Sequence, residues 1–207
     1  MGLDLTPFEQ RLARALADLE AGKPVLVADN ANRENEVDAI MAAATASEQW
    51  VAWLVRHTSG YICAPMPAAV AGRLDLPPMV PANQDPLRTN YAVSVDAAHG
   101  VTTGISAADR ALTLRTLGDS QSTADNLIRP GHVLPLRAHP LGIKGRPGHT
   151  EAAVELVAMA GAGEVAVIAE LVHDAGRLLT FEEAQRLAAE TGLQYLSIDE
   201  LLANSSD

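Results

Sequence analysis

The chain has 207 residues, with 26 acidic and 15 basic side chains and a formal net charge of −11. This acidic balance argues against a nucleic-acid binder, which needs a basic face, and against a polybasic membrane-surface protein. The single cysteine, Cys63, excludes an internal disulfide and a zinc site built on several thiolates. The sequence has no signal peptide and no apolar run of about 20 residues, so we expect a cytoplasmic protein without nucleic-acid or membrane partners.

The first half of the chain predicts helices and short apolar strands separated by polar loops. Thr6 and Glu9 form a capping box, so a helix begins at Pro7, and Gly22 ends it. Residues 76–90 are rich in Pro and Asn and form a long loop, which suggests function or mobility. The elements predicted between them are a strand over 24–28, a polar loop over 29–38, a strand over 39–44, a helix capped by Ser47 and a strand over 61–64.

The second half continues the mixture of strands and helices without strict alternation. Its predicted elements are a strand over 91–96, a helix from Ser106 through Leu117, a polar connection over 118–130, a strand over 132–136, a glycine-rich loop over 142–148, a helix over 151–160 capped by Thr150, a strand over 165–171, a helix from Thr180 to Gly192, a strand over 194–198 and a short last helix. This order predicts the α/β (α+β) class: a single domain over residues 1–207, with a mixed β-sheet flanked by helices.

The polar loop over 29–38 carries four carboxylates and an arginine between two apolar strands. Polar loops at strand ends are where α/β proteins place their sites, and carboxylate oxygens suit Mg²⁺. An acidic loop, taken without other information, is more often a solvated turn than a binding site. The loop alone therefore leaves both readings open.

A second candidate is the segment 145–151, which runs from a glycine-rich loop into a helix. Its glycines allow a ligand to approach the backbone closely, and the free amides that open the helix suit an anion. Arg146 adds a forked donor for phosphate, and His149 has the chemistry of a metal ligand or a base. A plain turn before a capped helix fits the same residues.

Three further residues stand out singly. His132 precedes an apolar strand, where it is a candidate general base or a hydrogen-bonded strand end. Glu170 lies within an apolar run, so we expect it to be at least partly buried. It then either pairs with another residue or has a shifted pKa that suits acid–base catalysis. Cys63 on a strand is typical of an inert small hydrophobic residue.

Five segments together resemble one known family. In chain order they are PVLVADNANRENEVD, RHTSGYICAPM, YAVSVDAAHGVTTGISAADRA, IRPGHVLPL and RPGHTEAAVELVAMAG. They follow the order seen in the 3,4-dihydroxy-2-butanone 4-phosphate synthases, over about residues 6–203. The resemblance implies a lyase of riboflavin biosynthesis that converts D-ribulose 5-phosphate into 3,4-dihydroxy-2-butanone 4-phosphate and formate. It also implies Mg²⁺ or Mn²⁺ as cofactor and a homodimer.

The resemblance also assigns roles by position. It implies that Glu34 and His149 ligate the metal, that His132 and Glu170 are catalytic, and that Cys63 faces the site. The substrate-binding residues that it implies are Arg33, Glu34, Asp38, Arg146, Pro147, Gly148, His149 and Thr150.

The first loop departs from the family pattern. Asn30, Ala31 and Asn32 stand where the family usually has acidic residues, and Val37 stands where it has a glycine. This departure motivates an alternative function: a diverged paralogue that binds a sugar phosphate without catalysis or with an altered substrate.

Overall fold

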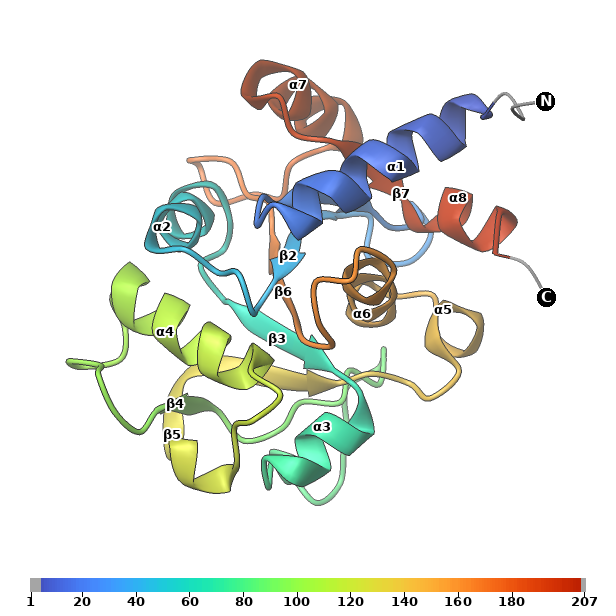
Figure 1. Ribbon diagram of the computed structural model, residues 1–207. Coiled ribbons are helices and arrows are strands. Elements are labelled where there is room, and N and C mark those ends of the chain that lie inside the picture. Colours follow the sequence, from blue (N-terminus) through green and yellow to red (C-terminus); the bar gives the residue numbers. More distant parts are fainter. Residues whose placement is uncertain (1–4, 206–207) are drawn as a thin grey trace.

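The computed structural model describes residues 5–205, which fold around one mixed seven-stranded sheet (Figure 1). The sheet has the strand order β4-β5-β3-β6-β2-β1-β7. The β1–β7 and β3–β5 pairs are parallel, and the other neighbouring pairs are antiparallel. The strands are Val25–Ala28 (β1), Val37–Ala42 (β2), Cys63–Met66 (β3), Val95–Ala97 (β4), Leu127–Arg137 (β5), Ala166–Glu170 (β6) and Tyr195–Ser197 (β7).

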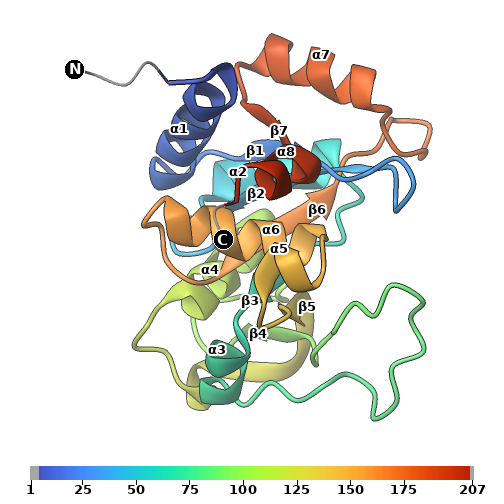
Figure 2. The same cartoon turned by 90° about the vertical axis from the view of Figure 1, so that its right-hand side faces the viewer.

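Helices cover both faces of this sheet, so the predicted α/β class with a mixed, helix-flanked sheet is confirmed (Figures 1 and 2). The helices are Pro7–Glu20 (α1), Glu48–His57 (α2), Ala68–Arg73 (α3), Ala107–Gly118 (α4), Gly142–Gly145 (α5), His149–Met159 (α6), Phe181–Thr191 (α7) and Ile198–Ala203 (α8), with a 3₁₀ turn at Ala124–Asn126. The predicted capping boxes at the starts of α1 and α7 are both present. Residues 1–4 and 206–207 of the expected domain span lie outside the described residues.

Two apolar cores lie on the opposite faces of the sheet, because successive side chains of a strand point to opposite sides. In β1, Leu26 packs into the core beneath α2, α4 and α7, whereas Val25 and Val27 pack into the core beneath α1 and α6. In β2, Met41 and Ile40 divide between the two cores in the same way. Burial on both faces explains why these strands read as continuous apolar runs in the sequence.

Several predicted boundaries are wrong. Strand β2 begins at Val37 and strand β3 at Cys63, so these strands take in Asp38 and exclude Tyr61. The predicted strand over 91–96 is reduced to Val95–Ala97, preceded by isolated bridges. The expected connection over 118–130 contains the start of β5, because Arg129 and Pro130 interrupt the apolar pattern of a strand that lies near the sheet edge.

Other errors concern helices. The six-residue helix α3 was not predicted, and the single turn α5 lies within the expected loop over 142–148. Helix α6 begins at His149 with Gly148 as its N-cap residue, so the expectation that Thr150 caps it is wrong. Among the described residues, no helix is long and apolar enough to cross a bilayer.

Candidate active site

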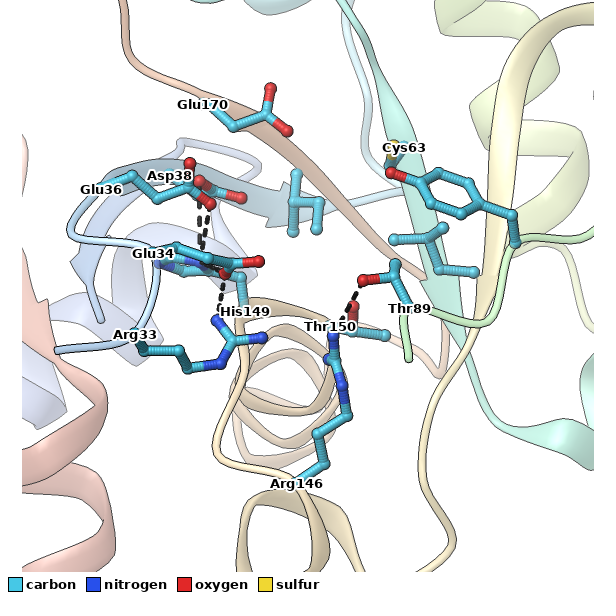
Figure 3. Close-up of a pocket in the computed structure, with 13 residues that line it drawn as sticks. Arg33, Glu34, Glu36, Asp38, Cys63, Thr89, Arg146, His149, Thr150 and Glu170 are labelled. Carbon is cyan, nitrogen blue, oxygen red and sulfur yellow. Dashed lines mark hydrogen bonds and ion pairs between the residues drawn. The ribbon is translucent and has the colours of Figure 1, made fainter. Parts of the chain in front are cut away.

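The pairing of strands places the predicted site residues on one face of the sheet. Asp38 of β2 lies opposite Glu170 of β6, and Ile168 lies opposite Cys63 of β3. These positions share the face that helix α6 covers, because residues two apart on a strand point the same way. The N-terminus of α6, at His149, therefore faces carboxylates from two neighbouring strands across a pocket (Figure 3).

The loop between β1 and β2 is organised by one buried carboxylate, that of Asp29. Its Oδ1 accepts the amide N–H of Glu36 at 3.1 Å, and its Oδ2 accepts the amide N–H of Glu34 at 2.9 Å. Oδ2 also pairs with the Arg33 guanidinium at 3.3 Å. Asn35 takes a left-handed conformation with φ of 55°, which asparagine tolerates. Asp29 thus turns the Glu34 and Glu36 side chains toward His149.

His149 is fully buried and is oriented by the sheet. Its Nε2 lies 2.9 Å from the carbonyl oxygen of Val27, which only a protonated Nε2 can satisfy. Its Nδ1 lies 3.8 Å from Glu34 and from Glu36 and 3.7 Å from Asp38. Both Nδ1 and Oδ1 of Asp38 are buried without a hydrogen-bond partner. Such orphaned atoms are costly unless a proton or a cation joins them.

The pKa values of His149 and of the acids crowded around it are shifted. Burial, together with the charges of Asp38 and Glu34, raises the pKa of Glu36 to about 8. Burial likewise raises the pKa of Asp38 to about 7, against the opposing effect of the His149 charge. Burial would lower the pKa of His149, but the carboxylates led by Asp38 outweigh it and raise that pKa to about 9. Burial also opposes ionisation of Glu34, yet His149 and Arg33 together lower its pKa.

These groups fit a divalent metal ion. Asp29, Glu34 and His149 form one cluster whose ligand atoms lie within 4.8 Å of one another, and Glu36, Asp38 and His149 form a second. Carboxylate oxygens suit hard cations, and a histidine whose far nitrogen is tied to a backbone carbonyl presents its other lone pair in a fixed direction. The orphaned Nδ1 of His149 and Oδ1 of Asp38 are the atoms such an ion would satisfy.

Two arginines, Arg33 and Arg146, border the pocket near the N-terminus of α6. Gly148, the N-cap residue of α6, has no side chain to satisfy the first amides of the helix. A Cβ atom at this position would lie 2.6 Å from Nη1 of Arg146 and 2.8 Å from Nη2 of Arg33. A side chain at this position would therefore displace the ends of two guanidinium groups. Two arginines beside free helix amides are an arrangement suited to phosphate.

Glu170 lies on the wall of the pocket and has a defined partner. Its Oε2 accepts a 2.5 Å hydrogen bond from the Ser59 hydroxyl, which itself accepts the amide N–H of Tyr61 at 3.1 Å. Ser59 is thereby fixed as a donor to the carboxylate. Cys63 also lines the pocket, and burial raises the pKa of its thiol well above the usual value.

Most residues singled out in the sequence come together here. Those that line the pocket are Arg33, Glu34, Asp38, Arg146, His149, Thr150, Glu170 and Cys63. Neither Pro147 nor Gly148 lines the pocket, although a Cβ at Gly148 would meet both guanidinium groups. His132 does not line it either; its ring Nδ1 lies 2.7 Å from Asp96, and its side chain is 41% exposed.

Other lining residues were not among the predicted site residues. They are Glu36, Thr89, Tyr91, Leu136 and Ile168. The acidic loop did flag Glu36 as one of four carboxylates but could not distinguish it from its neighbours. Thr89 and Tyr91 come from the long loop between α3 and β4, and nothing in the local sequence connects that loop with the helix that it approaches.

The fold and the pocket define a class: an α/β domain whose site pairs a cluster of acids and a histidine with two arginines. Comparisons with known proteins identify the family within this class. A model of the family described as 3,4-dihydroxy-2-butanone 4-phosphate synthase matches residues 13–204. The chain belongs to this family.

Individual relatives agree with this assignment. The riboflavin biosynthesis protein RibBA of Nocardia farcinica is 51% identical over 201 residues, which cover 96% of this chain and 48% of that protein. The protein of the same name from Salinispora arenicola is 50% identical over 192 residues, covering 93% of this chain and 46% of its own length. The chain thus spans about half the length of these curated relatives.

One solved structure matches over most of both chains. A crystal structure of 3,4-dihydroxy-2-butanone 4-phosphate synthase in complex with two magnesium ions superposes with a TM-score of 0.90 at 42% identity, covering 93% of this chain and 94% of that one.

Proposed function

We propose that this chain is a 3,4-dihydroxy-2-butanone 4-phosphate synthase, a lyase that converts D-ribulose 5-phosphate into 3,4-dihydroxy-2-butanone 4-phosphate and formate with Mg²⁺. The observation that carries the proposal is the pocket that brings a buried histidine and several acids together with two arginines, in a chain of this family. We further propose that the whole span 1–207 is one synthase domain, that Mn²⁺ can replace Mg²⁺, and that the protein works in the cytoplasm.

We assign the metal to Glu34 and His149, with Glu36 and Asp38 close enough to bind its water ligands. When bound, the ion would polarise the substrate carbonyl and favour loss of the neighbouring proton. Arg33, Arg146 and the first amides of α6 hold the phosphate, with the Thr150 side chain facing the same space. The substrate would then lie between the two ends of the pocket.

The reaction needs groups that move protons within that space. A base must remove the C3 proton of the substrate, and an acid must assist loss of the C1 hydroxyl. Glu170 is assigned to one of these transfers, because it lies on the pocket wall with only one oxygen engaged by Ser59. Asp38, with its pKa raised to about 7, can hold or release a proton at neutral pH. Leu136 and Ile168 close the apolar side against water.

His132 is the other residue assigned to proton transfer, but it does not line the pocket of its own chain. Asp96 holds its ring and its backbone N–H outside the pocket. Two exposed apolar side chains, Ile105 and Ile128, lie on the segments that contact Asp96. We therefore propose a homodimer that buries this patch and brings His132 of one copy to the pocket of the other.

The alternative, a sugar-phosphate binder without turnover, rested on the altered loop residues. Asn30 donates to Asp199 at 2.8 Å and caps a turn at Asn32. These residues border a separate hollow beside α7 and α8, so their side chains do not line the pocket around His149. The departure therefore gives little support to loss of catalysis.

Incubation of the purified protein with ribulose 5-phosphate and Mg²⁺, followed by an enzymatic assay for formate, tests the proposal. Turnover that EDTA abolishes and fresh Mg²⁺ restores is the expected result. Glu34→Gln should be inactive, while Glu48→Gln, on the exposed start of α2, should be fully active. Calorimetric binding of the substrate with no formate would favour the binding-only alternative.

A further inference from the structure

Glu151 is a buried carboxylate that the proposed reaction does not use. It lies in the first turn of α6, and its side chain is 2% exposed. Its Oε1 accepts the amide N–H of His139 at 2.9 Å, and its Oε2 accepts Nη1 of Arg146 at 2.8 Å. Both oxygens are thus engaged, one by the backbone and one by the guanidinium that borders the anion-binding end of the pocket.

Arg146 also forms hydrogen bonds with the loop between α3 and β4. Its Nη2 donates to Oγ1 of Thr89 at 2.9 Å, and its Nε donates to the carbonyl oxygen of Leu87 at 3.1 Å. Figure 3 shows the contact between Arg146 and Thr89 at the mouth of the pocket. Three of the five N–H donors of the guanidinium are therefore committed to protein, and two stay free for a ligand.

The part of that loop which Arg146 reaches, residues 80–90, is here named the distal loop. It projects from the molecule in Figure 2, and all of its residues are exposed except the half-buried Asp85 and Thr89. Hydrogen bonds within the loop, such as Thr89 N–H to Asp85 at 2.7 Å, shape it but do not fasten it to the domain. The bond from Arg137 N–H to the Asn90 carbonyl oxygen at 3.0 Å holds the end of the loop to β5, and the two bonds from Arg146 hold Leu87 and Thr89 at the edge of the pocket.

We propose that Glu151 is a positioning residue that holds Arg146 in place both to receive the substrate phosphate and to fasten the distal loop at the edge of the pocket. A buried arginine without its carboxylate would turn toward water or draw in another acid. Glu34 and Asp29 stand nearby, paired with Arg33. Glu151 keeps Arg146 from pairing with that acidic cluster, so that Arg146 stays available to an anion in the pocket.

The kinetic part of the inference rests on the proposed function. Glu151→Gln should disturb Arg146 because an amide that keeps the bond from His139 N–H turns its NH₂ group toward the guanidinium. The KM for ribulose 5-phosphate and the inhibition constant of inorganic phosphate should both rise about tenfold, with a smaller change in kcat, as expected when binding to a non-reacting group is lost. Glu151→Asp, which keeps the charge, should recover part of the loss.

Glu155 offers a matched control one turn along the same helix. Its Oε1 accepts the amide N–H of Ile143 at 2.8 Å, so it fastens the neighbouring segment to α6 as Glu151 does, but no arginine pairs with it in the described residues. Glu155→Gln should leave KM, phosphate inhibition and kcat within about twofold of the unaltered protein.

Hydrogen exchange measured by mass spectrometry gives a readout that needs no turnover. Glu151→Gln should speed exchange in the distal loop, and Thr89→Val, which removes the far end of the link and leaves Glu151 in place, should do the same. Glu155→Gln should not. If Glu151→Gln and Glu155→Gln behave alike in exchange and in phosphate inhibition, Glu151 is merely structural and the inference fails. If the unaltered protein makes no formate, the proposed function fails, while the exchange experiment still decides the role of Glu151.

Discussion

Metal binding by the His149 cluster should release protons, and the effect can be worked out from the structure. With a pKa raised to about 9, His149 is about 1% neutral at pH 7, yet only a neutral imidazole can ligate a cation. Glu36, with a pKa raised to about 8, is also mostly protonated at pH 7. Binding therefore displaces at least one proton, and Mg²⁺ affinity should rise about tenfold from pH 7 to pH 8.

Isothermal titration calorimetry at several pH values measures this change in Mg²⁺ affinity. Titrations of Mg²⁺, and of Mn²⁺ as a second probe, in two buffers with different ionisation enthalpies count the protons released. His149→Gln should abolish the proton release together with the tight binding. His99→Gln, at an exposed position outside the pocket, should change neither. An affinity that is constant between pH 6.5 and 8.5, with equal heats in both buffers, would refute the reasoning.

The same pKa shifts predict how the stability of the metal-free protein depends on pH. Glu36, Asp38 and His149 all have pKa values raised above their ordinary values in the folded state. Their contribution to stability is complete below the ordinary carboxylate pKa near 4, and it is lost as pH rises through about 7 to 9. The melting temperature in EDTA should therefore fall from pH 6 to pH 9, and added Mg²⁺ should restore more of it at the higher pH. A rise in melting temperature with pH would contradict the assigned shifts.

Three further predictions test the pocket and the core. Gly148→Ala, whose Cβ would lie 2.6 Å from one guanidinium nitrogen, should raise the KM for ribulose 5-phosphate at least tenfold in steady-state assays, and an unchanged KM would contradict that contact. Cys63 should react with a thiol reagent far more slowly in the folded than in the unfolded protein, because burial raises its pKa; equal rates would show that the thiol is accessible. Leu114→Ala, in the core, should cost about 2–5 kcal/mol in denaturant unfolding, whereas Leu141→Ala, at a residue 69% exposed, should cost less than about 0.5 kcal/mol; similar costs would argue against the assigned core.

Much of the fold could be predicted from local signals. The capping boxes at Thr6 and Thr180 and the apolar runs of β1 and β6 mark elements whose boundaries agree closely with the structure. The predicted strand over 132–136 is the second half of β5, whereas its first half was missed because Arg129, Pro130 and Gly131 interrupt the apolar pattern after Leu127 and Ile128. Helix α6 begins one residue before Thr150 because its N-cap residue is Gly148, and a glycine offers no side-chain capping signal in the sequence.

The site was predictable only in part, for a physical reason. The residues that lie in motifs, such as Glu34 and His149, could be found because each motif is continuous in the sequence. That Asp38 lies beside Glu170 depends on the pairing of β2 with β6, which no local pattern reveals. Thr89 reaches the pocket through a bond from Arg146, some 57 positions away in the chain.

The central claim is that this pocket cleaves ribulose 5-phosphate with a divalent ion, and one measurement tests it most directly. Carbon-13 NMR of uniformly labelled ribulose 5-phosphate, incubated with the Mg²⁺-loaded protein, follows substrate and both products together. We predict one formate for each four-carbon phosphate formed, with no reaction in EDTA. Unchanged substrate in the presence of folded, Mg²⁺-loaded protein, or a product formed without formate, would contradict the account.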